Sequence, residues 1–139
     1  MTITRTGALL LIVSVLVPVG AVAARAAAGK PAIEMKSNLA GKKVIATPQR
    51  LGIYYWDTEK AVHGKIRCTG KCAAAWPPVF VSAKVPKHVA GVMATFGTVQ
   101  RGKRLQLTVN GLPAYTFHGD KPGFVGCDGV DGWHAVRAG

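Results

Sequence analysis

The sequence predicts a small all-β or β-dominated domain with little helix, in which two repeated β-hairpin units form a pseudo-symmetric sheet. Two observations favour this fold. Residues 97–117 alternate apolar and polar side chains around two-residue turns, which is typical of β-hairpins. One order of aromatic, acidic, cysteine and tryptophan residues also occurs twice along the chain, which indicates an internal repeat.

The first 41 residues precede the predicted domain. Residues 1–28 are typical of a cleavable secretory signal peptide, because Arg5 lies before an apolar run and small residues with A-x-A spacing follow it. Pro18 and Gly20 interrupt an apolar run that is already short for a membrane span. We therefore expect a periplasmic or secreted protein with no stable membrane anchor after cleavage. Residues 29–41 contain few apolar side chains and predict a flexible leader, so that residues 42–139 form one domain.

The first half of this domain predicts a short hairpin and a single helical turn. Residues 44–46 and 51–56 are rich in β-branched and aromatic side chains, and a turn with Pro48 at its second position separates them. Residues 72–76 predict one turn of helix, which Pro77 and Pro78 end.

The second half predicts a three-stranded meander over residues 97–101, 104–109 and 112–117. Gly102-Lys103 suits a type II′ turn, and Asn110-Gly111 is a strong signal for a type I′ turn. A two-residue loop pairs Val109 with Leu112. The resulting sheet is apolar on both faces, so each face needs a cover, which we expect from the N-terminal hairpin and the loops that bear the tryptophans.

The repeat consists of two copies, at about 44–80 and 97–139. Each has a tyrosine, a second aromatic residue, an acid, a Cys-x-Gly tract and a tryptophan in the same order. The residues are Tyr54, Trp56, Glu59, Cys68 and Trp76 in the first copy, and Tyr115, Phe117, Asp120, Cys127 and Trp133 in the second.

Two motifs carry a resemblance to a known family. Residues 115–120 form a Y-x-[FWY]-x-x-D motif, and residues 68–78 match a C-x-G-x-C-A-x-x-W-P-P signature. Together they resemble the secreted repeat of unknown function family, the predicted lipoproteins with the Y-x-[FWY]-x-x-D motif. The resemblance implies an exported, repeat-built domain without an assigned activity. The chain departs from the pattern at Glu59, which replaces an aspartate, at Cys127, and in having no lipobox cysteine.

The cysteines and histidines leave several readings open. Cys68 and Cys72 are spaced to close a small disulfide loop around Gly70, with Cys127 left free, although Cys127 could instead pair with one of them. The alternative is a zinc or copper site formed by Cys68, Cys72, Cys127 and His134. No histidine shows a ligand spacing, so we expect a disulfide and no cofactor.

The acids and aromatic residues have structural and functional readings. Glu59 and Asp120 could be a general acid/base pair, but an acid just after a strand more often accepts backbone N–H groups in a turn. The aromatic residues of both copies could line a ligand groove, but a domain of this size needs them in its core. We find no catalytic constellation and expect a protein that is not an enzyme.

The net positive charge of the chain bears on which classes of partner it could bind. Eighteen lysines and arginines oppose six acids, giving a formal net charge of +12. The lysines are scattered and no nucleic-acid-binding module occurs, so nucleic acid is not an expected partner. The sequence therefore predicts an exported, non-catalytic binding or interaction domain of the bacterial cell envelope, with an envelope component or a protein as its partner. The alternative is a periplasmic metal-binding or redox and electron-transfer-associated protein that uses the cysteines and a histidine.

Overall fold

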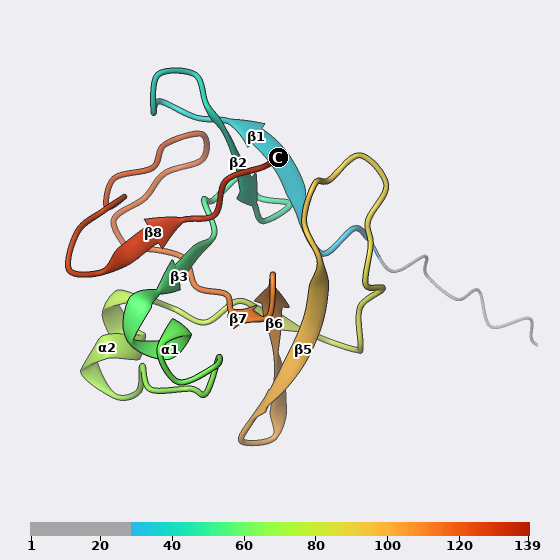
Figure 1. Ribbon diagram of the computed structural model, residues 1–139, viewed down its shortest axis with the longest axis vertical. Coiled ribbons are helices and arrows are strands. Elements are labelled where there is room, and N and C mark those ends of the chain that lie inside the picture. Colours follow the sequence, from blue (N-terminus) through green and yellow to red (C-terminus); the bar gives the residue numbers. More distant parts are fainter. Residues whose placement is uncertain (1–28) are drawn as a thin grey trace, which may run out of the picture.

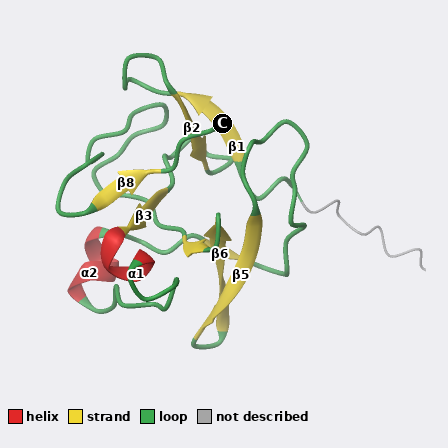
Figure 2. Ribbon diagram, in the orientation of Figure 1, coloured by secondary structure: helices red, strands yellow, loops and turns green. Residues whose placement is uncertain are grey.

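The structure, a computed structural model, describes residues 29–139, and β strands dominate it as the sequence predicts (Figures 1 and 2). The two helices in this range are four and five residues long. The elements are β1 (Ile33–Lys36), β2 (Lys43–Ala46), β3 (Tyr54–Trp56), α1 (Asp57–Lys60), α2 (Lys71–Ala75), β4 (Phe80–Val81), β5 (Phe96–Arg101), β6 (Arg104–Val109), β7 (Leu112–Pro113) and β8 (Trp133–Ala135).

The largest sheet is built around β6, which pairs with β5 on one side and with both β4 and β7 on the other. Both predicted turns form. Gly102 has a φ of 57°, and Asn110 and Gly111 have φ values of 51° and 80°, as type II′ and type I′ turns require. Val109 pairs with Leu112 in the predicted register.

The last strand of the predicted meander is much shorter than residues 112–117. β7 ends at Pro113, because β4 occupies the next stretch of the same edge of β6, where Phe80 pairs with Gln106. The chain then turns toward β3, and Tyr115 forms antiparallel bridges with Tyr54 and Pro78.

Residues 29–41 do not form the flexible leader that the sequence predicts. Ile33 to Lys36 form β1, which pairs with β2 along four residues. Ala32 and Met35 are buried. The prediction was wrong because it took the small number of apolar side chains in this segment as a sign of disorder. A strand of four residues needs only two apolar side chains on its buried face, and this segment has them.

The first predicted hairpin is also brief. A single bridge joins Ala46 to Gly52, after which β3 leaves β2 and pairs with β8 near the C-terminus, with Trp56 opposite Trp133. The predicted helical turn is α2, whereas α1 was not predicted. Figure 1 shows α1 and α2 together at one side of the molecule, next to β3.

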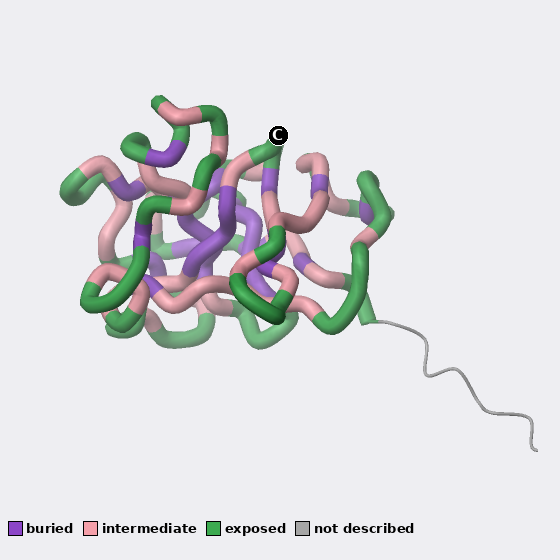
Figure 3. Tube along the Cα trace, turned by 90° about the horizontal axis from the view of Figure 1, so that it is seen from below, coloured by how far each residue is buried: buried purple, intermediate pink, exposed green. Residues whose placement is uncertain are grey.

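Buried side chains form two clusters in the middle of the molecule, and Figure 3 shows exposed loops around them. One cluster contains the cysteines and most motif aromatic residues, and the other lies against the β5–β6 hairpin. The predicted signal peptide, residues 1–28, lies outside the described residues. Within residues 29–139, no helix is long and apolar enough to cross a membrane.

Candidate functional site

The motif residues of both predicted copies meet around one backbone bridge. The amide nitrogen of Tyr54 donates to the carbonyl oxygen of Tyr115 at 2.8 Å, and the reverse bond measures 3.1 Å. Both tyrosine side chains are fully buried. The two motif tyrosines therefore lie side by side, joined by an antiparallel bridge.

Each tyrosine bonds to the acid of the other predicted copy. The hydroxyl of Tyr54 donates to Oδ2 of Asp120 at 2.6 Å, and the hydroxyl of Tyr115 donates to Oε1 of Glu59 at 2.7 Å. Such short O–H···O⁻ bonds are typical of a charged acceptor. The exchange ties the two halves of the domain together through four side chains.

Both carboxylates also organise a loop. Oε1 of Glu59 accepts the amide N–H groups of Arg67 and Cys68 at 2.8 and 3.0 Å. Oδ1 of Asp120 accepts the amide N–H of Gly126 at 2.8 Å. These are the bonds that a turn-capping acid makes. Oε2 of Glu59 is buried and has no hydrogen-bond partner.

Burial and these hydrogen bonds shift the pKa values of both tyrosines and of Asp120. Burial, followed by the hydrogen bond to a carboxylate, raises the pKa of Tyr54 and of Tyr115 well above the ordinary value. Burial also raises the pKa of Asp120, against the opposing hydrogen bond from Tyr54. The two acids are engaged separately, one with each tyrosine, and Glu59 is wholly enclosed. This arrangement does not favour the general acid/base alternative.

The other aromatic residues of the predicted repeat do not line a ligand groove. Their four rings stack in a row, which we call the aromatic ladder. The order is Trp56, Trp133, Trp76 and Phe117, with ring centroids 5.2, 4.0 and 4.8 Å apart. The planes of the three indoles are nearly parallel, at 2° and 8°. Trp76 and Trp133 are only 8% and 3% exposed, so the middle of the ladder belongs to the core.

The three cysteines form one disulfide and leave one free thiol. Cys68 and Cys72 are bonded, and Cys127 is free and half-buried. Two of the three thiolates of the proposed zinc or copper set are thereby consumed, and His134 bonds to Asp57 at 2.9 Å. The Cys₃His alternative is therefore wrong for the oxidised protein. No group of three potential ligand side chains gathers anywhere in residues 29–139.

Sequence reasoning missed Arg101. Its Nη1 donates to Oε1 of Gln106 at 3.1 Å and to the hydroxyl of Tyr115 at 3.3 Å, and its Nη2 donates to the carbonyl of Cys68. Arg101 thus joins the β5–β6 hairpin to the disulfide loop. An arginine beside a hairpin turn looks like a surface residue, so no sequence signal identifies this role.

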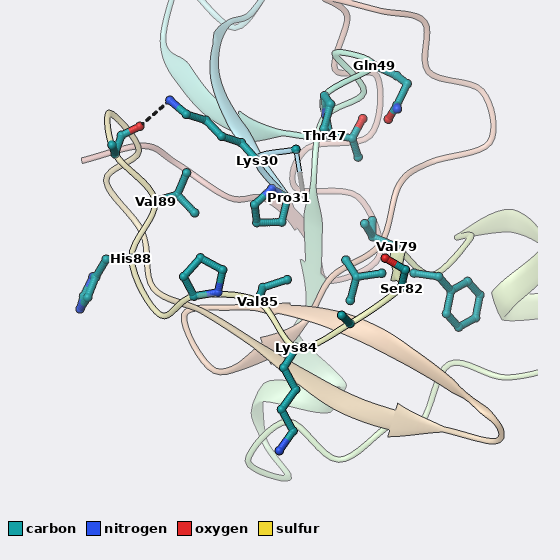
Figure 4. Close-up of a pocket in the computed structure, with 17 residues that line it drawn as sticks. Lys30, Pro31, Thr47, Gln49, Val79, Ser82, Lys84, Val85, His88 and Val89 are labelled. Carbon is teal, nitrogen blue, oxygen red and sulfur yellow. Dashed lines mark hydrogen bonds between the residues drawn. The ribbon is translucent and has the colours of Figure 1, made fainter. Parts of the chain in front are cut away.

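A groove of about 520 Å³ lies beside β4, between residues 29–31, the turn after β2 and the 82–90 loop (Figure 4). Its lining is mostly apolar and is drawn largely from residues 79–90. Figure 4 shows Lys30 reaching across to the carbonyl of Ala90, a contact of 2.9 Å. A second hollow shares Phe80, Val81 and Ser82 with the first and adds Lys103 and Arg104. Neither hollow is lined by an acid.

Nearly every acid is used inside the molecule. Glu59 and Asp120 accept hydrogen bonds from the two tyrosines. Glu34 and Asp128 form ion pairs with Lys43 and Arg137, and Asp57 forms a hydrogen bond with His134. Residues 29–139 hold sixteen lysines and arginines, of which fourteen have no carboxylate within ion-pair distance. All eleven lysines are exposed. The surface is therefore positively charged, because few of its basic side chains are paired with a carboxylate.

The chain was compared with protein-family models, with curated proteins and with solved structures, and none of them matches it.

Proposed function

We propose that this protein is an exported, non-catalytic interaction domain of the bacterial cell envelope that binds an extended acidic segment of a partner protein. The observation that supports the proposal is that most acidic side chains bond within the protein, whereas most basic side chains have no acidic partner. In residues 29–139, five of the six acids bond to side chains of the protein, while all eleven lysines are exposed and ten of them have no carboxylate within ion-pair distance. Such a surface attracts polyanions over a distance set by the ionic strength.

The groove beside β4 is the proposed contact surface. β4 is an edge strand, since among the described residues it pairs with β6 alone. An extended peptide laid along such an edge gains backbone hydrogen bonds while its side chains enter neighbouring pockets. The two neighbouring hollows are lined by four basic residues that supply the charges an acidic segment needs, namely Lys30, Lys84, Lys103 and Arg104.

Membership of the secreted-repeat family belongs to the same proposal. It rests on the Y-x-[FWY]-x-x-D and C-x-G-x-C-A-x-x-W-P-P residues, and the reciprocal contacts support two equivalent copies. Tyr54 packs edge-on against Trp76 at 5.1 Å, and Tyr115 packs edge-on against Trp133 at 5.2 Å. An approximate two-fold axis between the tyrosines would relate these pairs. Export through the predicted signal peptide would place the domain in an oxidising compartment, which suits the disulfide.

Fluorescence anisotropy with labelled poly-L-glutamate tests the binding proposal. Two double variants carry the same charge change: Lys30→Glu/Lys84→Glu on the groove, and Lys65→Glu/Lys71→Glu on exposed positions that do not line it. We expect binding that weakens with salt, and a loss of affinity in the groove variant that exceeds the control loss by about ten-fold.

Equal weakening in the two variants would show that net charge alone acts, and would overturn the groove as the site. Absence of binding to poly-L-glutamate at low salt would overturn the acidic-segment proposal itself. Tighter binding to vesicles of anionic phospholipid than to the peptide would assign the cationic surface to membrane contact instead.

A further inference from the structure

The aromatic ladder gathers nearly all the oxidisable rings of the protein. All three tryptophans belong to it, and two of the three tyrosines pack edge-on against its inner indoles. Successive centroids are separated by only 4.0 to 5.2 Å. Electron transfer between aromatic rings in such contact is fast, because the electronic coupling decays steeply with distance and these rings touch.

The ladder has one oxidisable entrance. Trp56 is half-buried, and its indole Nε1 donates to the carbonyl of Asp131 at 3.2 Å. At the other end lies Phe117, whose ring is far harder to oxidise than an indole. Trp133 and Trp76 are buried between them. A one-electron oxidant in solution can therefore reach the ladder at Trp56, while the inner rings stay protected.

Each tyrosine beside the ladder has a built-in proton acceptor. Oxidation of a phenol is easiest when its proton can leave at the same time, and the hydroxyls of Tyr54 and Tyr115 lie 2.6 and 2.7 Å from carboxylate oxygens. In Glu59 the second oxygen, Oε2, has no partner. A core built for packing alone gains little from such pairs, since apolar groups of the same shape are often as stable.

We propose that this cluster is a one-electron relay that carries an oxidising equivalent from Trp56 through Trp133 and Trp76 to Tyr54 and Tyr115. The oxidant, a peroxyl radical in solution, takes one electron from the indole of Trp56 and becomes a peroxide anion. An electron from Trp133 then reduces Trp56, and an electron from Trp76 reduces Trp133. A tyrosine supplies the last electron and passes its phenolic proton to its carboxylate. The products are the reduced oxidant, a tyrosyl radical and a protonated Asp120 or Glu59. A thiolate in solution then gives one electron and becomes a thiyl radical, and the proton returns from the carboxylate to re-form the phenol.

Transient absorption after photochemical oxidation tests this relay, with tris(bipyridine)ruthenium(III) as the dissolved oxidant. The protein carries Cys127→Ser, so that the free thiol cannot supply the electron. We expect a tryptophanyl radical that decays as a tyrosyl radical appears. Tyr54→Phe/Tyr115→Phe keeps the rings and removes the hydroxyls, and it should lower the tyrosyl yield and prolong the tryptophanyl radical by about ten-fold each.

Two further variants define the path. Tyr55→Phe removes the tyrosine outside the ladder and should change nothing. Trp56→Phe, at the half-buried end, should lower the tyrosyl yield by about ten-fold while the near-ultraviolet circular dichroism confirms a folded core. A tyrosyl yield that survives in Tyr54→Phe/Tyr115→Phe, or that Tyr55→Phe abolishes, would overturn the relay. So would a yield that is unaffected by Trp56→Phe.

Discussion

Tyr54 and Asp120 lie 66 positions apart in the chain, and their side chains share a 2.6 Å hydrogen bond. The bond between Tyr115 and Glu59 spans 56 positions. In both cases a tyrosine of one predicted copy satisfies the acid of the other. The motif side chains thus tie two halves of one domain together, and neither tyrosine bonds to the acid of its own half.

Removing the Tyr54 hydroxyl tests the strength of this lock. We predict that Tyr54→Phe lowers the free energy of unfolding by about 1–3 kcal/mol, since the half-buried carboxylate of Asp120 loses a charge-assisted bond. Denaturant titration measures the change, and Tyr55→Phe should stay within about 0.5 kcal/mol of the parent protein. In Asp120→Asn the further effect of Tyr54→Phe should shrink. Additive losses would show that the two side chains are not coupled.

Alkaline pH should weaken the fold through the two motif tyrosines. Burial raises the pKa of both, so the folded protein holds protons that the unfolded chain releases above about pH 10. Their stabilising contribution is present below that pH and falls as the pH rises through it, by about 1.4 kcal/mol per pH unit for each tyrosine. Unfolding titrations from neutral to strongly alkaline pH should show a shallower decline for Tyr54→Phe/Tyr115→Phe. Parallel curves would refute this assignment.

Cys127 should be a slow nucleophile despite being free. Burial raises its pKa first, and the charges of Asp120 and Asp131 add to the effect. Less thiolate forms at neutral pH, and the thiolate is the reactive species. Alkylation with iodoacetamide, followed by mass spectrometry, should modify one cysteine, and Asp131→Asn should react faster than the parent protein. An unchanged rate would mean that enclosure of the sulfur, rather than charge, limits the reaction.

The ladder should show a gradient of stability from its middle to its end. We predict that Trp133→Ala costs about 3–5 kcal/mol of unfolding free energy, because it opens a cavity between two stacked indoles. Trp56→Ala, at the half-buried end, should cost distinctly less. Thermal or chemical denaturation of the two variants gives the comparison, and equal losses would contradict the ladder as the centre of this core.

The sequence predicts those parts of the fold that local chemistry determines. Gly102 and the Asn110-Gly111 pair dictate two turns and therefore the β5–β6–β7 pairing. The end of β7 was not predictable, since it depends on β4 arriving at the same edge of β6. β1 was not predicted, because a four-residue strand with only two apolar side chains resembles a flexible segment in sequence.

The candidate site divides in the same way. The spacing of Cys68 and Cys72 favours their disulfide, and the offsets of the tyrosines and acids predict that they occupy equivalent positions of a repeat. The offsets carry no information about which tyrosine reaches which acid, because that depends on how the two halves pack. Arg101 was missed for the same reason, since its three acceptors lie on separate segments of the chain.

Amide chemical-shift mapping by NMR, during titration with poly-L-glutamate, tests the central claim most directly. We predict that shifts concentrate in residues 79–85 and 103–105 and around Lys30, where the two hollows lie. The amide signals of Arg67, Cys68 and Gly126, whose N–H groups bond to the carboxylates of Glu59 and Asp120, should not shift. Shifts centred on those three amides, or no localised shifts at all, would contradict an interaction domain that acts through the groove beside β4 and its flanking lysines.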